Sequence, residues 1–222
     1  AIATTLTACH QSTQPTPKAS PTGAENCRTI GHDAGETTIC DQPQTVVTLG
    51  PNLLELLLAL DIQPVGHAEY FPFPIDVFDQ PAQQIPYLGE RLTGQPRNIG
   101  TAHDPALEVI AELKPDLILG DTLKNQDEYA LLSHNAPTLL LTYDEPKKNW
   151  AADLQTVAQA LNLSDRAEAV ISKFQQRQTG LRQEIAQKVA QTPKVLLLLG
   201  QRLDQEIRIE TRHSACGGLL EE

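Results

Sequence analysis

The chain has 222 residues, of which 40% are apolar, so it can bury a core and is not a disordered protein. Its formal net charge at pH 7 is -11, from 17 basic and 28 acidic residues. The basic residues are scattered along the chain, which argues against a nucleic-acid partner, because phosphate binding needs a clustered basic surface.

The first nine residues, AIATTLTAC, look like the end of a signal peptide, and LTAC fits the cleavage box of a bacterial lipoprotein. We therefore expect Cys9 to carry a lipid anchor, the alternative being an ordinary cysteine in a frayed end. No initiating Met or basic segment precedes it, so the sequence is expected to begin inside the signal. Residues 10–26 are rich in Pro, Ser, Thr and Gln, which predicts a flexible tether.

Residues 27–40, CRTIGHDAGETTIC, hold two short β-prone runs around His-Asp-Ala-Gly, a pattern typical of a β-hairpin. Cys27 and Cys40 flank this hairpin. Because the signal would direct the chain to an oxidising compartment, we expect a cross-strand disulfide between them, the alternative being two free thiols. For Cys216 the sequence identifies no partner.

Downstream of the hairpin, apolar strands alternate with helices, which predicts an α/β fold. The strands are apolar throughout rather than alternating, as expected of a parallel sheet that helices cover on both faces. The predicted strands span residues 45–49, 64–68, 116–120 and 138–142. The predicted helices span residues 51–60, 105–113 and 125–134. Asp104 is expected to be the N-cap of the second helix, with Pro105 at its first position.

Residues 164–189 form the longest segment with apolar side chains at three- and four-residue spacing, which predicts one continuous helix. At about 1.5 Å per residue this helix would be roughly 40 Å long. It is long enough to cross from one lobe of a protein to another.

No residue grouping in the sequence is typical of catalysis. The motifs GxSxG, HExxH, GxxxxGK[ST] and GxGxxG are missing, and the cysteines lack CxxC spacing. We therefore expect that the protein is not an enzyme. The alternative is an α/β enzyme or signalling domain, whose sequence would contain a nucleotide-binding loop or an activated nucleophile. The histidines are far apart, and only His67 and Glu69 are placed to begin a metal site, so no direct metal site is expected.

Ligands of open parallel sheets bind outside the carboxyl ends of the strands. Four aromatic residues gather between positions 70 and 78, interleaved with prolines, and could form a wall for a flat organic ligand; core packing is the alternative for some of them. The segments at the predicted strand ends are 50–52, 67–73, 120–124 and 142–145. From these segments and from the long loop before residue 105, the candidate ligand contacts are Asn52, His67, Tyr70, Phe73, Tyr87, Arg91 and Tyr143.

Two segments, VVTLGPNLLELLLALDIQPVGH and YLGERLTGQPRNIGTAHDPALEVIAELKPDLILGD, resemble the N-terminal lobe of the periplasmic binding proteins of iron-siderophore and cobalamin ABC importers. The resemblance extends from about Cys27 to the last residue. It implies a two-lobed α/β fold whose lobes are joined by a long helix. The expected parts are a complete N-terminal lobe over 27–145, an interlobe helical region over 146–192, and a truncated C-terminal lobe over 193–222.

The resemblance also implies a function, namely capture of a ferric siderophore and its delivery to an ABC transporter permease. Such a protein would be a lipid-anchored monomer in the periplasm or on the outer face of the plasma membrane, with no cofactor. Cobalamin or haem is the alternative ligand. Ferric complexes of catecholates and carboxylates are usually anionic, and the planar cation of Arg91 is suited to bind them. The alternative is that Arg91 is an ordinary solvated charge on the surface.

The motif PALEVIAELKPDLI resembles the family segment in which a Glu meets an Arg of the permease, and the matching residue is Glu108. A second such carboxylate is expected at Glu221, in HSACGGLLEE. The alternative for Glu108 is a solvated charge that the positive N-terminal end of its helix favours.

Overall fold

The computed structural model describes residues 26–142, 150–188, 198–200 and 207–209. The predicted lipid anchor at Cys9, the tether, and the residues Tyr143, Cys216 and Glu221 lie outside these ranges.

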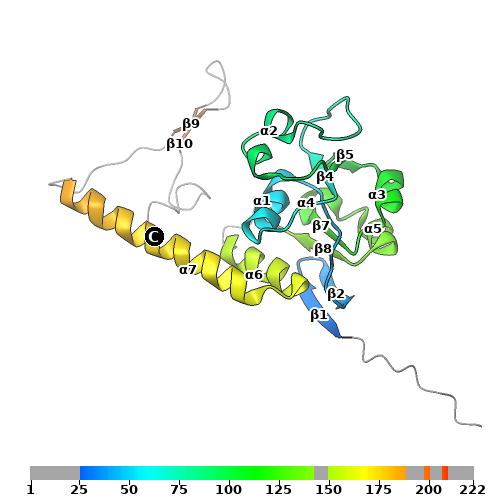
Figure 1. The fold of residues 1–222 in the computed structure, drawn as a ribbon, viewed down its shortest axis with the longest axis horizontal. Helices are drawn as coiled ribbons and strands as arrows, with labels where there is room; N and C mark the ends of the chain where they lie inside the picture. The colour runs from blue at the N-terminus through cyan, green and yellow to red at the C-terminus, as the bar shows by residue number, and fades with distance from the viewer. Residues whose placement is uncertain (1–25, 143–149, 189–197, 201–206, 210–222) are drawn as a thin grey trace, which may run out of the picture.

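The largest sheet has six strands, in the order β6-β5-β4-β3-β7-β8, and forms the centre of the domain on the right of Figure 1. All its neighbouring strands pair in parallel except β5 and β6. The strands are β3 (Val46–Thr48), β4 (Gly66–Glu69), β5 (Arg97–Thr101), β6 (Asp104–Pro105), β7 (Leu117–Asp121) and β8 (Thr138–Leu141). The predicted α/β class and the four predicted strands are confirmed, whereas β5 and β6 were not predicted from the sequence.

Helices cover both faces of the sheet, as the apolar strands require. In β3, Val46 packs in the cluster that contains α1 (Pro51–Ala59) and α6 (Trp150–Leu161). Its neighbour Val47 packs on the opposite face, in the cluster that contains α3 (Leu107–Leu113) and α5 (Tyr129–Asn135). The shorter helices are α2 (Pro81–Gln84), η1 (Gly89–Arg91) and α4 (Thr122–Asn125).

The start of α3 differs from the prediction. Asp104 and Pro105 form β6, which pairs antiparallel with Thr101 and Gly100 at the edge of the sheet, and the helix begins at Leu107. Proline is tolerated there because an edge strand has a side that needs no N–H donor. Gly100 has a φ of 88°, and a Cβ on it would come within 2.6 Å of the Asp104 carbonyl oxygen, so this tight return requires glycine.

The predicted hairpin consists of β1 (Cys27–His32) and β2 (Gly35–Cys40), and its register places Cys27 opposite Cys40. A disulfide joins these two cysteines. The Arg28 guanidinium donates to the carbonyl oxygens of Gln159 and Ala160 at the end of α6. The hairpin is therefore fixed to the main body by side chains as well as by its own pairing.

Asp116 joins the beginning of β7 to the residues before β3. Its Oδ2 accepts hydrogen bonds from the Gln44 N–H and the Thr45 N–H, both at 2.9 Å, and from Thr45 Oγ1 at 2.8 Å. Desolvation by burial raises the pKa of Asp116, but the three hydrogen bonds together outweigh it and hold the pKa below its ordinary value.

The predicted long helix is α7 (Ser164–Lys188), which packs against α6 and runs on past the sheet domain (Figure 1). Farther along the chain, β9 (Leu198–Gly200) pairs antiparallel with β10 (Ile207–Ile209). None of the helices in the described part of the chain is both long and apolar enough to cross a membrane.

Candidate functional site

The sheet has a switch point between β3 and β7. The chain leaves the carboxyl end of β3 through α1 and returns in β4 on one side, whereas it leaves β7 through α4 and α5 and returns in β8 on the other side. The two connections diverge, and ligands of folds with this topology bind at such a point. Residues 50–52 and 121–124 follow the carboxyl ends of β3 and β7 at this point, as the sequence predicts.

At the end of β3, a glycine brings two predicted contacts together. Gly50 has a φ of 146°, and a Cβ on it would come within 2.9 Å of Asn52 Oδ1. The Tyr70 hydroxyl, from the end of β4, donates to the same Asn52 oxygen at 3.4 Å. Asn52 and Tyr70 therefore lie side by side at the switch point, although they are far apart in sequence.

A lysine that was not among the predicted ligand contacts completes this group. Lys124 Nζ lies 2.6 Å from Asp121 Oδ2 and 5.1 Å from the centre of the Tyr70 ring. Asp121 also caps α4, because its Oδ1 accepts the Leu123 N–H at 2.9 Å. The only signal in the sequence is the spacing of three between an acid that ends a strand and a base in the next helix.

Behind this group, a buried amide ties the strand ends together. Asn125 Oδ1 accepts the Asp121 N–H at 3.0 Å, and its Nδ2 donates to the Ala102 carbonyl oxygen at 2.9 Å. The ends of β5 and β7 and the last residue of α4 are thus held in one network, which gives Asp121 and Lys124 a rigid support.

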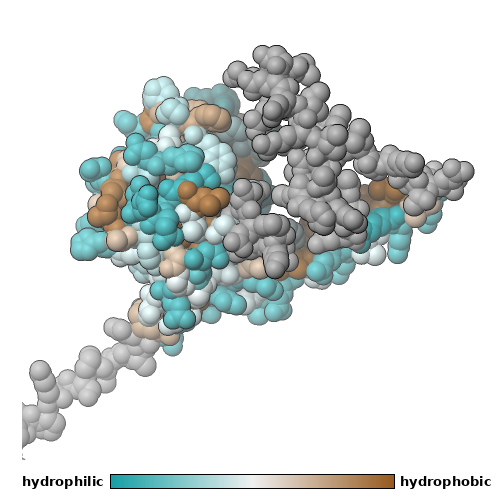
Figure 2. All heavy atoms as spheres, turned by 180° about the vertical axis from the view of Figure 1, so that it is seen from behind, coloured by the Kyte–Doolittle hydropathy of each residue, from teal (hydrophilic) through white to brown (hydrophobic). Residues whose placement is uncertain are grey.

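Apolar side chains accompany the polar ones at the site. Phe71 is 73% exposed and Leu123 is 65% exposed, and each follows or precedes a residue of the group just described. The opposite view of the molecule, in Figure 2, shows a mostly hydrophilic surface with small separate hydrophobic patches. Exposed apolar side chains next in sequence to the site are of the kind that suits the organic part of a ligand.

His67 was predicted to face the ligand, but the structure buries it completely. Its Nδ1 lies 2.9 Å from Thr48 Oγ1 on the neighbouring strand, and its Nε2 lies 3.1 Å from Glu69 Oε1. Both ring nitrogens are therefore occupied. The second oxygen of Glu69 accepts the Tyr70 N–H at 3.3 Å, so His67 and Glu69 support the site from inside the sheet.

Arg91 and Phe73 are also engaged with the protein. Arg91 Nη2 donates to the Leu58 carbonyl oxygen at 2.8 Å, at the last turn of α1. Since α1 starts at the carboxyl ends of the strands, its last turn is at the opposite end of the sheet, away from the switch point. Phe73 is half-buried, with its ring centre 5.9 Å from that of the buried Phe78. Tyr87 is fully exposed on its loop.

Glu108, the predicted docking residue, is exposed in the first turn of α3. This helix begins beside the carboxyl end of β5 and ends with Leu113 near Gly66, at the start of β4. Glu108 thus lies at the same end of the sheet as the switch point. On the same helix, Glu112 lies 3.8 Å from Arg97, whereas the structure records no ion pair for Glu108 within the described residues.

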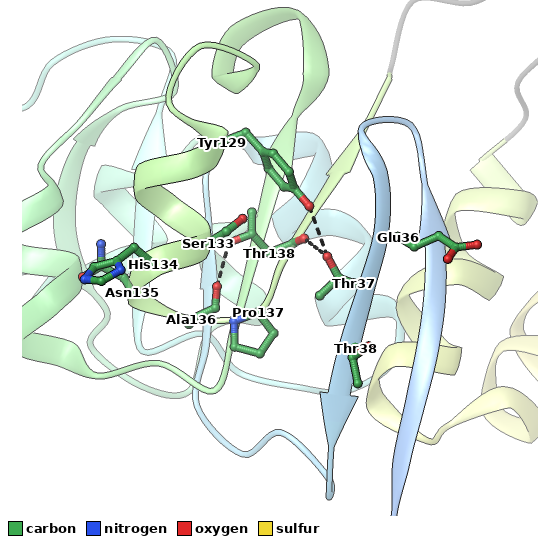
Figure 3. Close-up of a pocket in the computed structure, with 10 residues that line it drawn as sticks. All are labelled: Glu36, Thr37, Thr38, Tyr129, Ser133, His134, Asn135, Ala136, Pro137 and Thr138. Carbon is green, nitrogen blue, oxygen red and sulfur yellow. Dashed lines mark hydrogen bonds between the residues drawn. The ribbon is translucent and has the colours of Figure 1, made fainter.

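A groove of about 460 Å³ lies at the opposite end of the sheet, between β2, α5 and the start of β8 (Figure 3). Three of its lining residues are bonded to one another, since Thr37 Oγ1 donates to the Thr138 carbonyl oxygen at 2.8 Å and lies 3.3 Å from the Tyr129 hydroxyl. These contacts attach the hairpin to the sheet. We therefore place the candidate site at the switch point. No group of three or more potential metal-ligating side chains occurs among the described residues.

The sequence profile described as Periplasmic binding protein matches residues 46–222. The chain belongs to this family. The periplasmic binding protein is 30% identical to the probable siderophore-binding lipoprotein YfiY of Bacillus subtilis over 195 residues, which cover 87% of this chain and 56% of that protein. It is 28% identical to the Fe(3+) dicitrate-binding periplasmic protein FecB of Escherichia coli over 194 residues, covering 86% of this chain and 59% of that protein.

Among solved structures, the siderophore-binding protein FhuD from Vibrio cholerae, bound to Fe3+-Desferal, is similar to this periplasmic binding protein. The two share 26% identity and superpose with a TM-score of 0.66 over 80% of this chain and 64% of that one. The family and the fold class expected from the sequence are confirmed. The chain spans more than half, but less than two thirds, of the length of the curated relatives named above.

Proposed function

We propose that this periplasmic binding protein captures a ferric siderophore and delivers it to the permease of an ABC importer. The observation that carries the proposal is the convergence of Asn52, Tyr70 and Lys124 at the switch point of the sheet. Two of its relatives are a probable siderophore-binding lipoprotein and an Fe(3+) dicitrate-binding protein. Ferric siderophores and ferric dicitrate are both iron chelates. The protein would supply affinity rather than reaction chemistry.

The site has the composition that an iron chelate requires. Such a ligand combines apolar or aromatic organic parts with a rim of oxygens, so it needs flat apolar contacts and a few polar groups. The Tyr70 ring and the exposed Phe71 suit the organic part, and Lys124 and the Asn52 amide suit the oxygens. Tyr87 and Tyr143 remain proposed contacts, and the second lobe would supply the rest of the pocket.

Delivery would use one carboxylate on each lobe. Glu108 is exposed at the end of the sheet that carries the ligand site, so a permease could contact it while facing the ligand. Glu221 is the proposed counterpart on the second lobe. A permease could contact both carboxylates at once only when both lobes are correctly placed.

The proposed location is the periplasm or the outer face of the plasma membrane, with lipid on Cys9 and the protein as a monomer. The relative from Bacillus subtilis is described as a lipoprotein, which supports the anchor. The tether of residues 10–26 has a root-mean-square span of roughly 20 to 25 Å if it behaves as a flexible coil. That span would leave the protein free to rotate near the membrane.

A fluorescence-quenching titration of the full-length protein against a panel of ferric chelates tests the proposal. We expect saturable quenching by at least one ferric siderophore. Cobalamin or haem is the competing ligand of the same fold, and a corrin or Soret band in the purified protein would favour it. Absence of quenching by every ferric chelate would contradict the proposed function.

A further inference from the structure

We infer that Lys124 sets the charge preference of the ligand site by donating to an anionic oxygen of the ferric chelate, with Asp121 as its positioning residue. The inference rests on the proposed function and narrows its substrate class to chelates with carboxylate or catecholate oxygens. It replaces Arg91, whose guanidinium is engaged at the other end of the sheet.

The geometry places the ammonium group where a ligand would meet it. Nζ bonds Asp121 Oδ2 at 2.6 Å and lies 5.1 Å from the centre of the Tyr70 ring, so it spans the ends of β7 and β4. An ammonium carries three N–H donors, and Asp121 occupies one of them. The Tyr70 face adds a cation–π attraction that holds the group beside the end of β4.

Burial makes this lysine different from a surface lysine. The Lys124 side chain is 16% exposed and that of Asp121 is 1% exposed, so Lys124 is the more accessible residue of the pair. Asp121 lies behind it, with Oδ1 on the Leu123 N–H. A bond from a poorly hydrated ammonium to an anion is short-range and weakly screened by salt.

The other described charges near the switch point leave this role to Lys124. Glu69 is buried and bonded to His67 and to the Tyr70 N–H. Arg97 begins β5 and so lies at the amino ends of the strands, beside Glu112. Within the described segments that follow the strand ends, residues 50–52, 70–73, 102–103 and 121–125, Lys124 is the lone Lys or Arg.

The test measures the affinity of the full-length protein for two chelates. Ferric dicitrate is the anionic chelate, and Fe3+-Desferal is the chelate that carries no negative charge. Lys124→Met should weaken ferric dicitrate binding by about tenfold or more, the size of one charge-assisted hydrogen bond. It should change Fe3+-Desferal binding by less than about twofold. Lys124→Arg should restore most of the loss. Lys173→Met, at an exposed position on α7, is the matched control and should change neither affinity.

Asp121→Asn separates positioning from simple electrostatics. It removes a negative charge beside the ligand, so electrostatics alone predicts tighter ferric dicitrate binding, whereas loss of the lysine's support predicts weaker binding. We expect weaker binding, with thermal melting to check that the variant folds. Tighter binding would overturn the positioning role, and equal effects of Lys124→Met on both chelates would overturn the charge preference. A wild-type protein that binds only Fe3+-Desferal would overturn it too, whereas one that binds no ferric chelate would refute the proposed function itself.

Discussion

Replacement of both hairpin cysteines, Cys27→Ser with Cys40→Ser, is expected to lower the free energy of unfolding by about 3 kcal/mol. The disulfide closes a loop with a sequence separation of 13. The chain-entropy relation converts a loop of this size into roughly 3 kcal/mol at 25 °C, through the greater freedom of the unfolded chain when the link is absent.

The folded state should change little in this variant. Ile30 and Ile39 are buried in the main apolar cluster, and Arg28 still donates to the end of α6. These contacts hold the hairpin on the domain without the disulfide. The predicted loss therefore arises in the unfolded chain, and the far-ultraviolet circular dichroism of the folded variant should match that of the wild type.

Urea unfolding followed by circular dichroism measures the difference. Treatment of the wild type with a reductant should bring it to the stability of the double variant, and the same reductant should leave the variant unchanged. Equal stability of the oxidised wild type and the variant would refute the reasoning. A loss far above about 3 kcal/mol would also refute it, because the hairpin would then have left the domain in the folded state.

Three further predictions concern docking, pH and anchoring. Glu108→Arg should abolish uptake in cells while ligand affinity stays unchanged, and normal transport would identify Glu108 as an ordinary surface charge. Asp116→Asn should lower the free energy of unfolding at neutral pH by about 1 kcal/mol, a small value because the carboxylate is largely exposed. Since the folded pKa of Asp116 is held below its unfolded value, this contribution to stability is present above about pH 4 and is lost as the pH falls through the folded pKa. In urea unfolding, the stabilities of the wild type and the Asp116→Asn variant should therefore become equal in acid. Cys9→Ser should release the protein from the membrane fraction or leave it unprocessed, and identical fractionation and mass would exclude the lipid.

The sequence predicts those strands of the sheet that are continuously apolar. β7 is buried along its whole length, and its LILGD run identifies it directly. β5 is harder to predict, because only Ile99 is buried within Arg97–Thr101. A single apolar residue forms no repeating pattern in the sequence. In β6, the pair Asp104-Pro105 has the composition of a helix start, and only the glycine turn at Gly100 and the pairing with β5 make it a strand.

The site is less predictable than the fold because it depends on register and on contacts distant in sequence. His67 is buried on the inner strand β4, where the parallel register places Thr48 opposite it as a hydrogen-bond partner, and no local pattern reveals this. Arg91 bonds the Leu58 carbonyl oxygen, which is 33 residues away. Strand-end segments were predictable, and they contain Asn52, Tyr70 and Lys124, but which side chains meet there required the structure.

The hairpin also determines how mechanical force would enter the molecule. With lipid on Cys9, tension between membrane and protein would reach the described structure just before Cys27. Because Cys27 and Cys40 are bonded at the open end of the hairpin, that tension crosses the disulfide and follows residues 41–45 directly into β3, at the centre of the sheet. In the oxidised protein the disulfide would carry most of this tension past the hairpin. After reduction the tension would instead load the hydrogen bonds of the hairpin and the contacts of Arg28 and Ile30 with the domain.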